Sequence, residues 1–215
     1  MNAKEALFYA LAVILGGCRT VSTIQPLYSE KDVTFEEKLL GVWSADPNDP
    51  KNRLQVERLV SDAKNAYRLT FSDKDGRKGA FELRLVRLEG QLYFDIAPLA
   101  FPSGEEIEDE PYAYNGLYFL RLHTFGRIDA IEPVLIVRLS SEGHMKEFLR
   151  ESPDAIEHTL AERNKLLLTA STDKLQAFVI KYKDDERLFV WPIEFHRIKI
   201  GAPGYLTEEE RAGGR

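Results

Sequence analysis

The amino-acid sequence predicts a mainly β domain, in which an antiparallel meander of about eight to ten strands closes into a barrel. Two short helices are expected before the last strand. From Gly41 onward, apolar and polar residues alternate with the period of two that is typical of half-buried strands. The turn-forming pairs Asp75-Gly76 and Glu89-Gly90 separate the alternating runs. The composition, 44% hydrophobic and 30% charged, is that of a globular chain rather than a disordered one.

The clearest strands are three successive runs, AYRLTFS, AFELRL and QLYFDI, which are joined by turn-rich segments. Each run places large apolar side chains on one face and mainly polar side chains on the other. The apolar sets are Tyr67, Leu69 and Phe71, then Phe81, Leu83 and Leu85, and then Leu92, Phe94 and Ile96. Because tight turns join antiparallel neighbours, these runs predict a meander.

Further strands are expected on both sides of this meander. LLGVWS and LQVERLV precede it, and VLIVRLS, EHTLA, KLLLT and WPIEFHRI follow it. The run GLYFLRLHTFGRID is apolar on both faces, so it predicts a strand that is covered on both sides. In the last run, Trp191, Ile193 and Phe195 are in phase and are expected to share one face. Closure into a barrel removes the exposed edges of such a sheet.

Two helices are expected between these later strands. The segments SSEGHMKEFLRE and STDKLQAFVIKY each place apolar residues at the three- and four-residue spacing of one helix face. The expected buried residues are Met145, Phe148 and Leu149 in the first helix, and Leu175, Phe178, Val179 and Tyr182 in the second.

The first 17 residues have the pattern of an export signal. Lys4 precedes an unbroken apolar run, LFYALAVIL, over residues 7–15. A run of about nine apolar residues suits a signal peptide and is too short for a bilayer core, which needs roughly 20 residues. The motif LGGC then ends in the single cysteine of the chain, Cys18, and it resembles the lipobox of bacterial lipoproteins.

This resemblance implies cleavage between Gly17 and Cys18 and acylation of the Cys18 thiol. One acyl chain binds a membrane only marginally, whereas two or more anchor a protein firmly. We therefore expect a protein of the cell envelope, held at the outer membrane if the organism has two membranes and otherwise on the outer face of the cell membrane. The alternatives are an ordinary secretory signal, or a buried N-terminal helix with an incidental cysteine.

The chain divides into four expected segments. Residues 1–17 form the signal peptide, and residues 18–37 form the lipidated cysteine and a flexible tether, because this stretch is polar and shows no periodicity. Residues 38–200 form the barrel domain, and residues 201–215 form a disordered tail.

A second resemblance comes from Gly41-x-Trp43 in LLGVWS, which is similar to the Gly-x-Trp signature of lipocalins. It implies that Trp43 closes the floor of a lipocalin-like barrel and that Arg197, from the last strand, packs over its ring. Such a cation–π contact contributes about 1 kcal/mol. The segments LLGVWS, YRLTFSDKDG, LHTFGRID, ESPDAIEH and LLLTASTDKLQAF also resemble a group of bacterial lipoproteins with no established activity, which implies export and one compact domain.

The sequence indicates no catalytic chemistry. A net charge of −6 argues against nucleic acid as a partner. The four histidines do not have metal-ligand spacing, and no nucleophile elbow or phosphate loop is present. We therefore expect a non-enzymatic protein without metal or cofactor. The acidic run SGEEIEDEPYAY (103–114) is either a site for a cation or basic partner, or a solvated loop.

Two functions of different classes are compatible with this sequence. In the first, the barrel carries a small apolar ligand, and Tyr67, Phe71, Phe81, Phe94 and His123 line its cavity. The alternative for His123 is a structural histidine with its hydrogen bonds satisfied inside an apolar strand. In the second, the core is solid and the domain engages another envelope protein as an adaptor or inhibitor. A cavity of at least about 300 Å³ would favour the first function, and a filled interior would favour the second.

Overall fold

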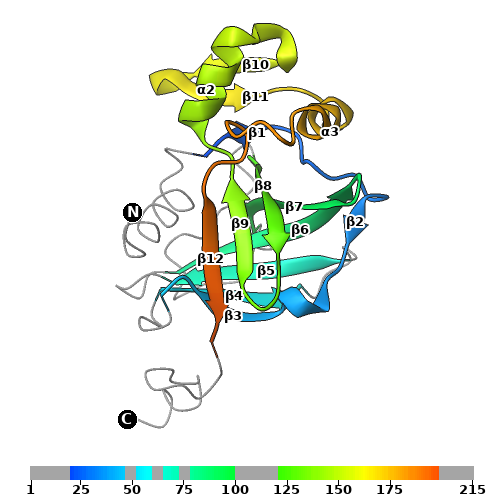
Figure 1. Ribbon diagram of the computed structural model, residues 1–215, viewed down its shortest axis with the longest axis vertical. Coiled ribbons are helices and arrows are strands. Elements are labelled where there is room, and N and C mark those ends of the chain that lie inside the picture. Colours follow the sequence, from blue (N-terminus) through cyan, green and yellow to red (C-terminus); the bar gives the residue numbers. More distant parts are fainter. Residues whose placement is uncertain (1–19, 47–51, 60–64, 73–77, 100–120, 199–215) are drawn as a thin grey trace, which may run out of the picture.

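The computed structural model describes residues 20–46, 52–59, 65–72, 78–99 and 121–198, and in this part of the chain eight strands close into an antiparallel barrel (Figure 1). The sequence prediction of a mainly β, barrel-forming domain is therefore confirmed. The barrel strands are β3 (Gly41–Ser44), β4 (Arg53–Arg58), β5 (Ala66–Ser72), β6 (Lys78–Leu88), β7 (Gln91–Pro98), β8 (Thr124–Ala130), β9 (Leu135–Leu139) and β12 (Pro192–Arg197).

The strands from β3 to β9 follow one another around the barrel as the predicted meander. The last strand, β12, closes it by pairing with β9 on one side and β3 on the other. The turn between β6 and β7 consists of Glu89 and Gly90, both with positive φ, and pairs Leu88 with Gln91. These are the dihedral angles of a two-residue hairpin turn. The expected turn at Asp75-Gly76 lies outside the described residues.

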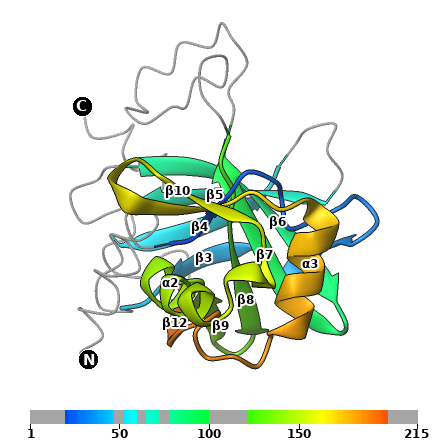
Figure 2. The ribbon, with the colours of Figure 1, turned by 90° about the horizontal axis from the view of Figure 1, so that it is seen from above.

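A second layer covers one side of the barrel; it appears above the barrel in Figure 1, and Figure 2 shows its helices from above, in front of the barrel strands. It contains helices α2 (Glu142–Glu151) and α3 (Thr172–Lys181), which stand before the last strand as predicted. It also contains a small sheet in the order β1-β11-β10. The strands of this sheet and the remaining short elements are β1 (Ser22–Thr23), β10 (His158–Ala161), β11 (Lys165–Leu168), β2 (Val33–Thr34), and the 3-10 helices η1 (Glu37–Leu39), η2 (Pro153–Ala155) and η3 (Glu162–Asn164).

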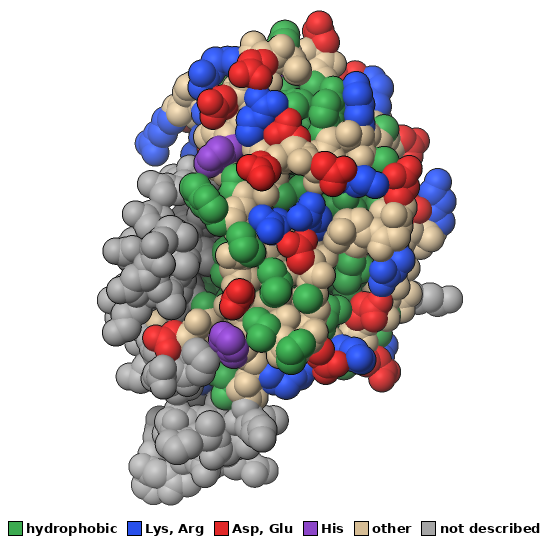
Figure 3. Space-filling view, in the orientation of Figure 1, with side chains coloured by type: hydrophobic (Ala, Val, Ile, Leu, Met, Phe, Trp, Pro, Cys, Tyr) green, Lys and Arg blue, Asp and Glu red, His purple; other side chains and the backbone are tan. Residues whose placement is uncertain are grey.

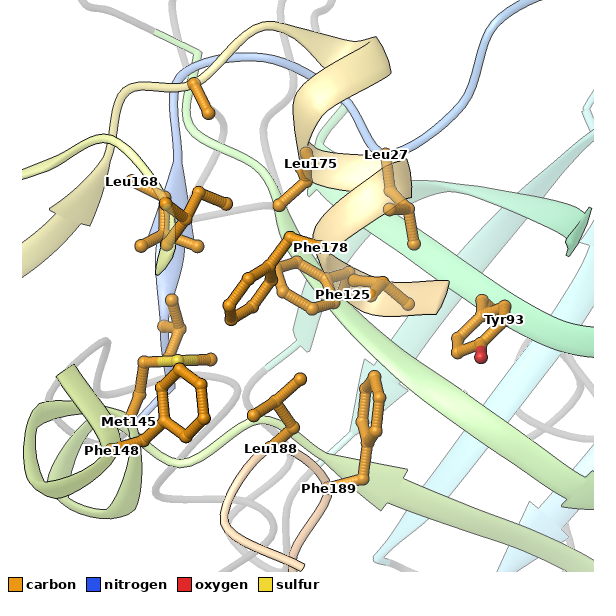
Figure 4. Close-up of a cluster of buried hydrophobic side chains, with 14 of the residues drawn as sticks. Leu27, Tyr93, Phe125, Met145, Phe148, Leu168, Leu175, Phe178, Leu188 and Phe189 are labelled. Carbon is orange, nitrogen blue, oxygen red and sulfur yellow. The ribbon is translucent and has the colours of Figure 1, made fainter. Parts of the chain in front are cut away.

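Two hydrophobic cores result from this arrangement. One fills the barrel, and the other lies between the outer wall of the barrel and the second layer. Figure 4 shows Phe125 of β8 and Phe178 of α3 near the centre of this outer core, with Tyr93 to one side and Phe148 below. The sequence correctly predicted β8 as a doubly covered strand, because Phe125 enters the outer core and Ile128 enters the barrel.

The N-terminal segment differs from its prediction as a flexible tether. From Thr20 onward the chain is packed: Val21 and Leu27 are fully buried in the outer core, β1 pairs with β11, and β2 pairs with β6. The sequence did not indicate this packing, because Val21 and Leu27 are isolated apolar residues in a polar stretch and show no periodicity. The backbone of β1 and β2 is hydrogen-bonded to neighbouring strands. Cys18, the signal segment and the expected C-terminal tail lie outside the described residues.

Trp191 also differs from its prediction. It was expected to share a face with Ile193 and Phe195, but β12 begins at Pro192, and Trp191 lies in the bend before it. The bend, rather than the strand pleat, therefore sets the direction of the ring, which is 63% exposed. Ile193 and Phe195 do pack with the barrel core.

Candidate functional site

The barrel encloses a cavity whose walls are entirely apolar. All of its lining side chains are Leu, Val, Ile or Phe, and they come from η1 and from seven of the barrel strands. The alternation within each strand explains this lining, since Leu54 and Val56 of β4, or Phe94 and Ile96 of β7, point inward while their neighbours point outward. The cavity volume is about 50 Å³. It is therefore a small hydrophobic space in an otherwise filled barrel.

The residues expected to line the cavity have different positions. Phe94 lines it, whereas Tyr67 and Phe71 belong to the same core but are not part of the lining. Phe81 packs against this core from a partly buried position. Tyr67 instead contacts the segment before η1: its ring stacks on Phe35, and its hydroxyl accepts a hydrogen bond from Glu36 N at 2.6 Å. Burial raises the pKa of Tyr67 to about 12, so the phenol is neutral at physiological pH.

Trp43 and Arg197 form the contact that the lipocalin resemblance implies for the barrel floor. Arg197 and Trp43 are directly paired residues of β12 and β3, and the guanidinium carbon lies 4.2 Å from the centre of the indole ring. The same guanidinium donates to the carbonyls of Leu40, at 2.7 Å, and Lys38, at 2.5 Å. The fully buried Trp43 donates from Nε1 to the Leu39 carbonyl at 2.9 Å. Together these contacts fasten η1 across the end of the barrel.

Gly41 explains why glycine precedes this tryptophan. Its φ of +135° is rarely adopted by other residues, and an added Cβ would lie 2.4 Å from Nη1 of Arg197.

We expect Gly41→Ala to lower the free energy of unfolding by about 1–3 kcal/mol, measured by urea denaturation. Part of this cost is displacement of Arg197, so Gly41→Ala should cost less in an Arg197→Ala background. An equal loss of unfolding free energy in both backgrounds would contradict the close contact between residue 41 and the Arg197 guanidinium.

His123 does not line the barrel cavity. It lies on the outer wall, where its Nδ1 is 2.6 Å from Oδ1 of Asp95, a residue that alternates outward between Phe94 and Ile96. The other oxygen, Oδ2, accepts a hydrogen bond from Leu27 N at 2.8 Å. His123 also exchanges two backbone hydrogen bonds with Thr23, each of 2.9 Å. The buried His123–Asp95 pair therefore fastens the N-terminal segment to the barrel.

A carboxylate-oriented imidazole is also a component of hydrolase sites, so its surroundings decide its role. In the described part of the chain, no serine, threonine or cysteine side chain is hydrogen-bonded to His123. The hydroxyls of the neighbouring Thr23 and Thr124 donate to the carbonyls of Gln25 and Val21. In the described ranges, the hydrogen bonds of the His123–Asp95 pair join the N-terminal segment to the barrel wall, and we call this arrangement the clamp.

An ionic cluster adjoins this clamp. Glu82 binds Arg84 at 2.7 Å and Arg121 at 2.8 Å, and Arg84 also lies over the ring of Tyr28. Burial alone would raise the pKa of Glu82, but the hydrogen bonds from both arginines outweigh it and lower the pKa from its ordinary value of 4.5. Asp129 behaves in the same way: burial opposes ionisation, and its bonds to Arg138 and Arg127 lower its pKa.

These lowered pKa values predict sensitivity to acid. A carboxylate with a lower pKa in the folded state adds stability above its unfolded pKa, and this stability is lost as the pH falls through the folded value. The urea midpoint should therefore be nearly constant from about pH 7 to 5 and should fall below about pH 4.5. Glu82→Gln should lower the midpoint at pH 7 and flatten the acid limb. An unchanged acid limb in this variant would contradict the role of Glu82.

Within the described ranges, no group of three or more His, Cys, Asp or Glu residues could hold a metal ion. No helix in these ranges is long and apolar enough to cross a bilayer. The fold and site define a closed antiparallel β-barrel of lipocalin-like form, with a small apolar cavity and a second layer on its outer wall. Comparisons of the chain with protein-family models, curated proteins and solved structures gave no match.

Proposed function

We propose that this protein is an exported, lipid-anchored binder, without catalytic activity, that takes one slender apolar ligand into its barrel. The observation that carries the proposal is the cavity, because every side chain around it is hydrocarbon. Such a space excludes charged and hydrogen-bonding groups, since burying them unpaired costs several kcal/mol. It accepts methylene groups, each of which contributes about 0.8 kcal/mol on burial.

The cavity volume restricts the ligand further. A volume of about 50 Å³ is far below the roughly 300 Å³ of a typical small-molecule pocket. A group the size of a water molecule or a methylene needs about 10–15 Å³ of cavity volume, so this cavity holds on the order of four such groups. Ring systems are therefore too large. The end of a single acyl chain fits, and it would recover the contacts that the empty cavity lacks.

The same small volume favours a second candidate function. A largely filled barrel is what we expect of an adaptor or inhibitor that engages another envelope protein through its surface. Binding of an acyl chain separates the two functions, because a solid-core module has no saturable site for one.

The binding experiment is a titration of the protein with a fluorescent fatty acid. Val56→Phe fills the cavity from β4 and should abolish saturable binding. Glu57→Phe places the same side chain on the exposed side of the same strand, and it should bind as the wild type does. Absence of saturable binding in the wild type, or equal binding by both variants, would reject the acyl-chain proposal and leave the interaction module.

The lipid anchor is supported by the LGGC motif after the apolar run over residues 7–15. We expect Cys18→Ser to abolish firm attachment, because serine has no thiol to receive the diacylglycerol. The variant should appear in the soluble exported fraction or remain unprocessed, as judged by fractionation and intact mass. Processed Cys18→Ser protein that still sediments with membranes would contradict the proposal.

A further inference from the structure

We infer that the surface around Trp191 rests on the lipid bilayer into which the acyl chains of Cys18 insert. This inference depends on the lipid anchor proposed above. It adds an orientation: one particular side of the domain faces the membrane.

Only a short length of chain separates the anchor from the fold. Cys18 precedes Thr20 by only two residues, and consecutive Cα atoms are 3.8 Å apart, so the two Cα atoms are separated by at most about 8 Å. Thr20 is itself fixed, since it is buried and forms a β-bridge with Ser141. A diacylated Cys18 therefore brings the headgroup region to the immediate surroundings of Ser141.

The side chains near Ser141 are of a kind that suits a membrane–water interface. The Ser141 hydroxyl is 3.0 Å from Nδ1 of His144, and the His144 ring lies edge-on to Trp191 with 5.4 Å between ring centres. Trp191 and Leu160 are the two exposed large hydrophobic residues of the described ranges. Tryptophan is enriched at membrane–water interfaces, because its ring is apolar and its N–H remains hydrated.

The arrangement of elements brings these features to one side of the molecule. The start of β1, the start of α2 and the upper end of β12 lie close together in Figure 1. On the same side, Figure 3 shows hydrophobic side chains beside a histidine. Leu160 pairs with Leu166 across the β10–β11 hairpin, and the Leu166 amide is bound by Glu142 at the start of α2. Leu160 is thus connected through β11 to the start of α2, next to the Ser141 that pairs with Thr20.

The chain offers a direct optical test, because it has two tryptophans in opposite environments. Trp43 is fully buried, whereas Trp191 is 63% exposed. The full-length lipidated protein is reconstituted into vesicles of phosphatidylethanolamine and phosphatidylglycerol, with plain or dibrominated acyl chains. We expect the bromine atoms to quench the Trp191 emission and leave Trp43 unaffected. Trp191→Phe should remove the quenchable component without changing the fold, as checked by circular dichroism.

A linker variant tests the cause of the orientation. Insertion of twelve Gly and Ser residues between Arg19 and Thr20 gives a coil of about 20 Å. The protein should remain anchored but lose the quenching. Persistence of full quenching in this variant would contradict the role of the short connection.

The outcomes distinguish the two proposals. Wild-type protein that sediments with the vesicles, yet shows the same emission with plain and brominated lipids, would overturn the orientation and leave the anchor intact. Wild-type protein of unmodified mass that stays in the supernatant would overturn the lipid anchor itself.

Discussion

Trp43→Ala is expected to lower the free energy of unfolding by about 3–5 kcal/mol, the range for removing a large aromatic side chain from a core. The indole ring is fully buried, donates to the Leu39 carbonyl and supports the guanidinium of Arg197. Its removal leaves a cavity at the barrel floor, an unpaired carbonyl and a cation without its ring. Urea denaturation, monitored by far-ultraviolet circular dichroism, measures the loss.

Trp191→Ala is the matched control for this prediction. It makes the same change of residue at a side chain that is 63% exposed and outside both cores, so its effect should remain within about 0.5 kcal/mol. Similar losses in the two variants would contradict the assignment of Trp43 as the residue that closes the floor.

Asp95→Ala is expected to be comparably severe, at about 3–5 kcal/mol, because breaking a buried pair leaves its partner unsatisfied. Asp95 is 2% exposed and binds both His123 and the Leu27 amide. The change leaves the His123 ring and the Leu27 amide without their hydrogen-bond partner, and it releases the N-terminal segment from the barrel wall. Equilibrium unfolding measures the stability, and hydrogen exchange at the Leu27 amide measures the release.

Two further variants separate this clamp from general effects of carboxylate removal. Asp129→Ala removes a carboxylate that is bound to Arg127 and Arg138 nearer the surface, and it should cost about 1 kcal/mol or less. Asp95→Asn retains an acceptor for Leu27, so it should protect that amide better than Asp95→Ala does. Unchanged exchange at Leu27 in Asp95→Ala would contradict the clamp.

The sequence could predict the barrel because its determinants are local. Alternation in β5, β6 and β7 and the Glu89-Gly90 turn are visible within a few residues, and they define the meander. The two helices could be predicted for the same reason, because in each of them the buried apolar residues lie on a single face. These residues are Met145, Phe148 and Leu149 in α2, and Leu175, Phe178 and Val179 in α3.

The outer core and the clamp could not be predicted, since they depend on contacts between distant segments. Leu27 and Asp95 are separated by 68 positions, and neither has a local pattern that reveals the other. From the sequence, His123 could line the cavity or be a hydrogen-bonded structural residue, and the layer that covers the barrel wall gives it the second role. The position of Trp191 differs for a related reason, because the alternation in the sequence begins before the strand itself does.

The size of the cavity could not be predicted from the sequence either. Inward-pointing aromatic residues can either line a space or fill it, and the choice depends on side-chain packing around the whole barrel. The rings of Tyr67 and Phe71 fill part of the barrel core, whereas Phe94 lines the cavity that remains.

The measurement that tests the proposed function most directly is native mass spectrometry of the full-length protein, purified gently from its own host. We expect a chain that begins at an acylated Cys18 and carries one additional apolar molecule of single-chain size, which is lost on denaturation and absent from Val56→Phe. An unmodified chain, or a clean mass without ligand in the wild type and the variant alike, would contradict it.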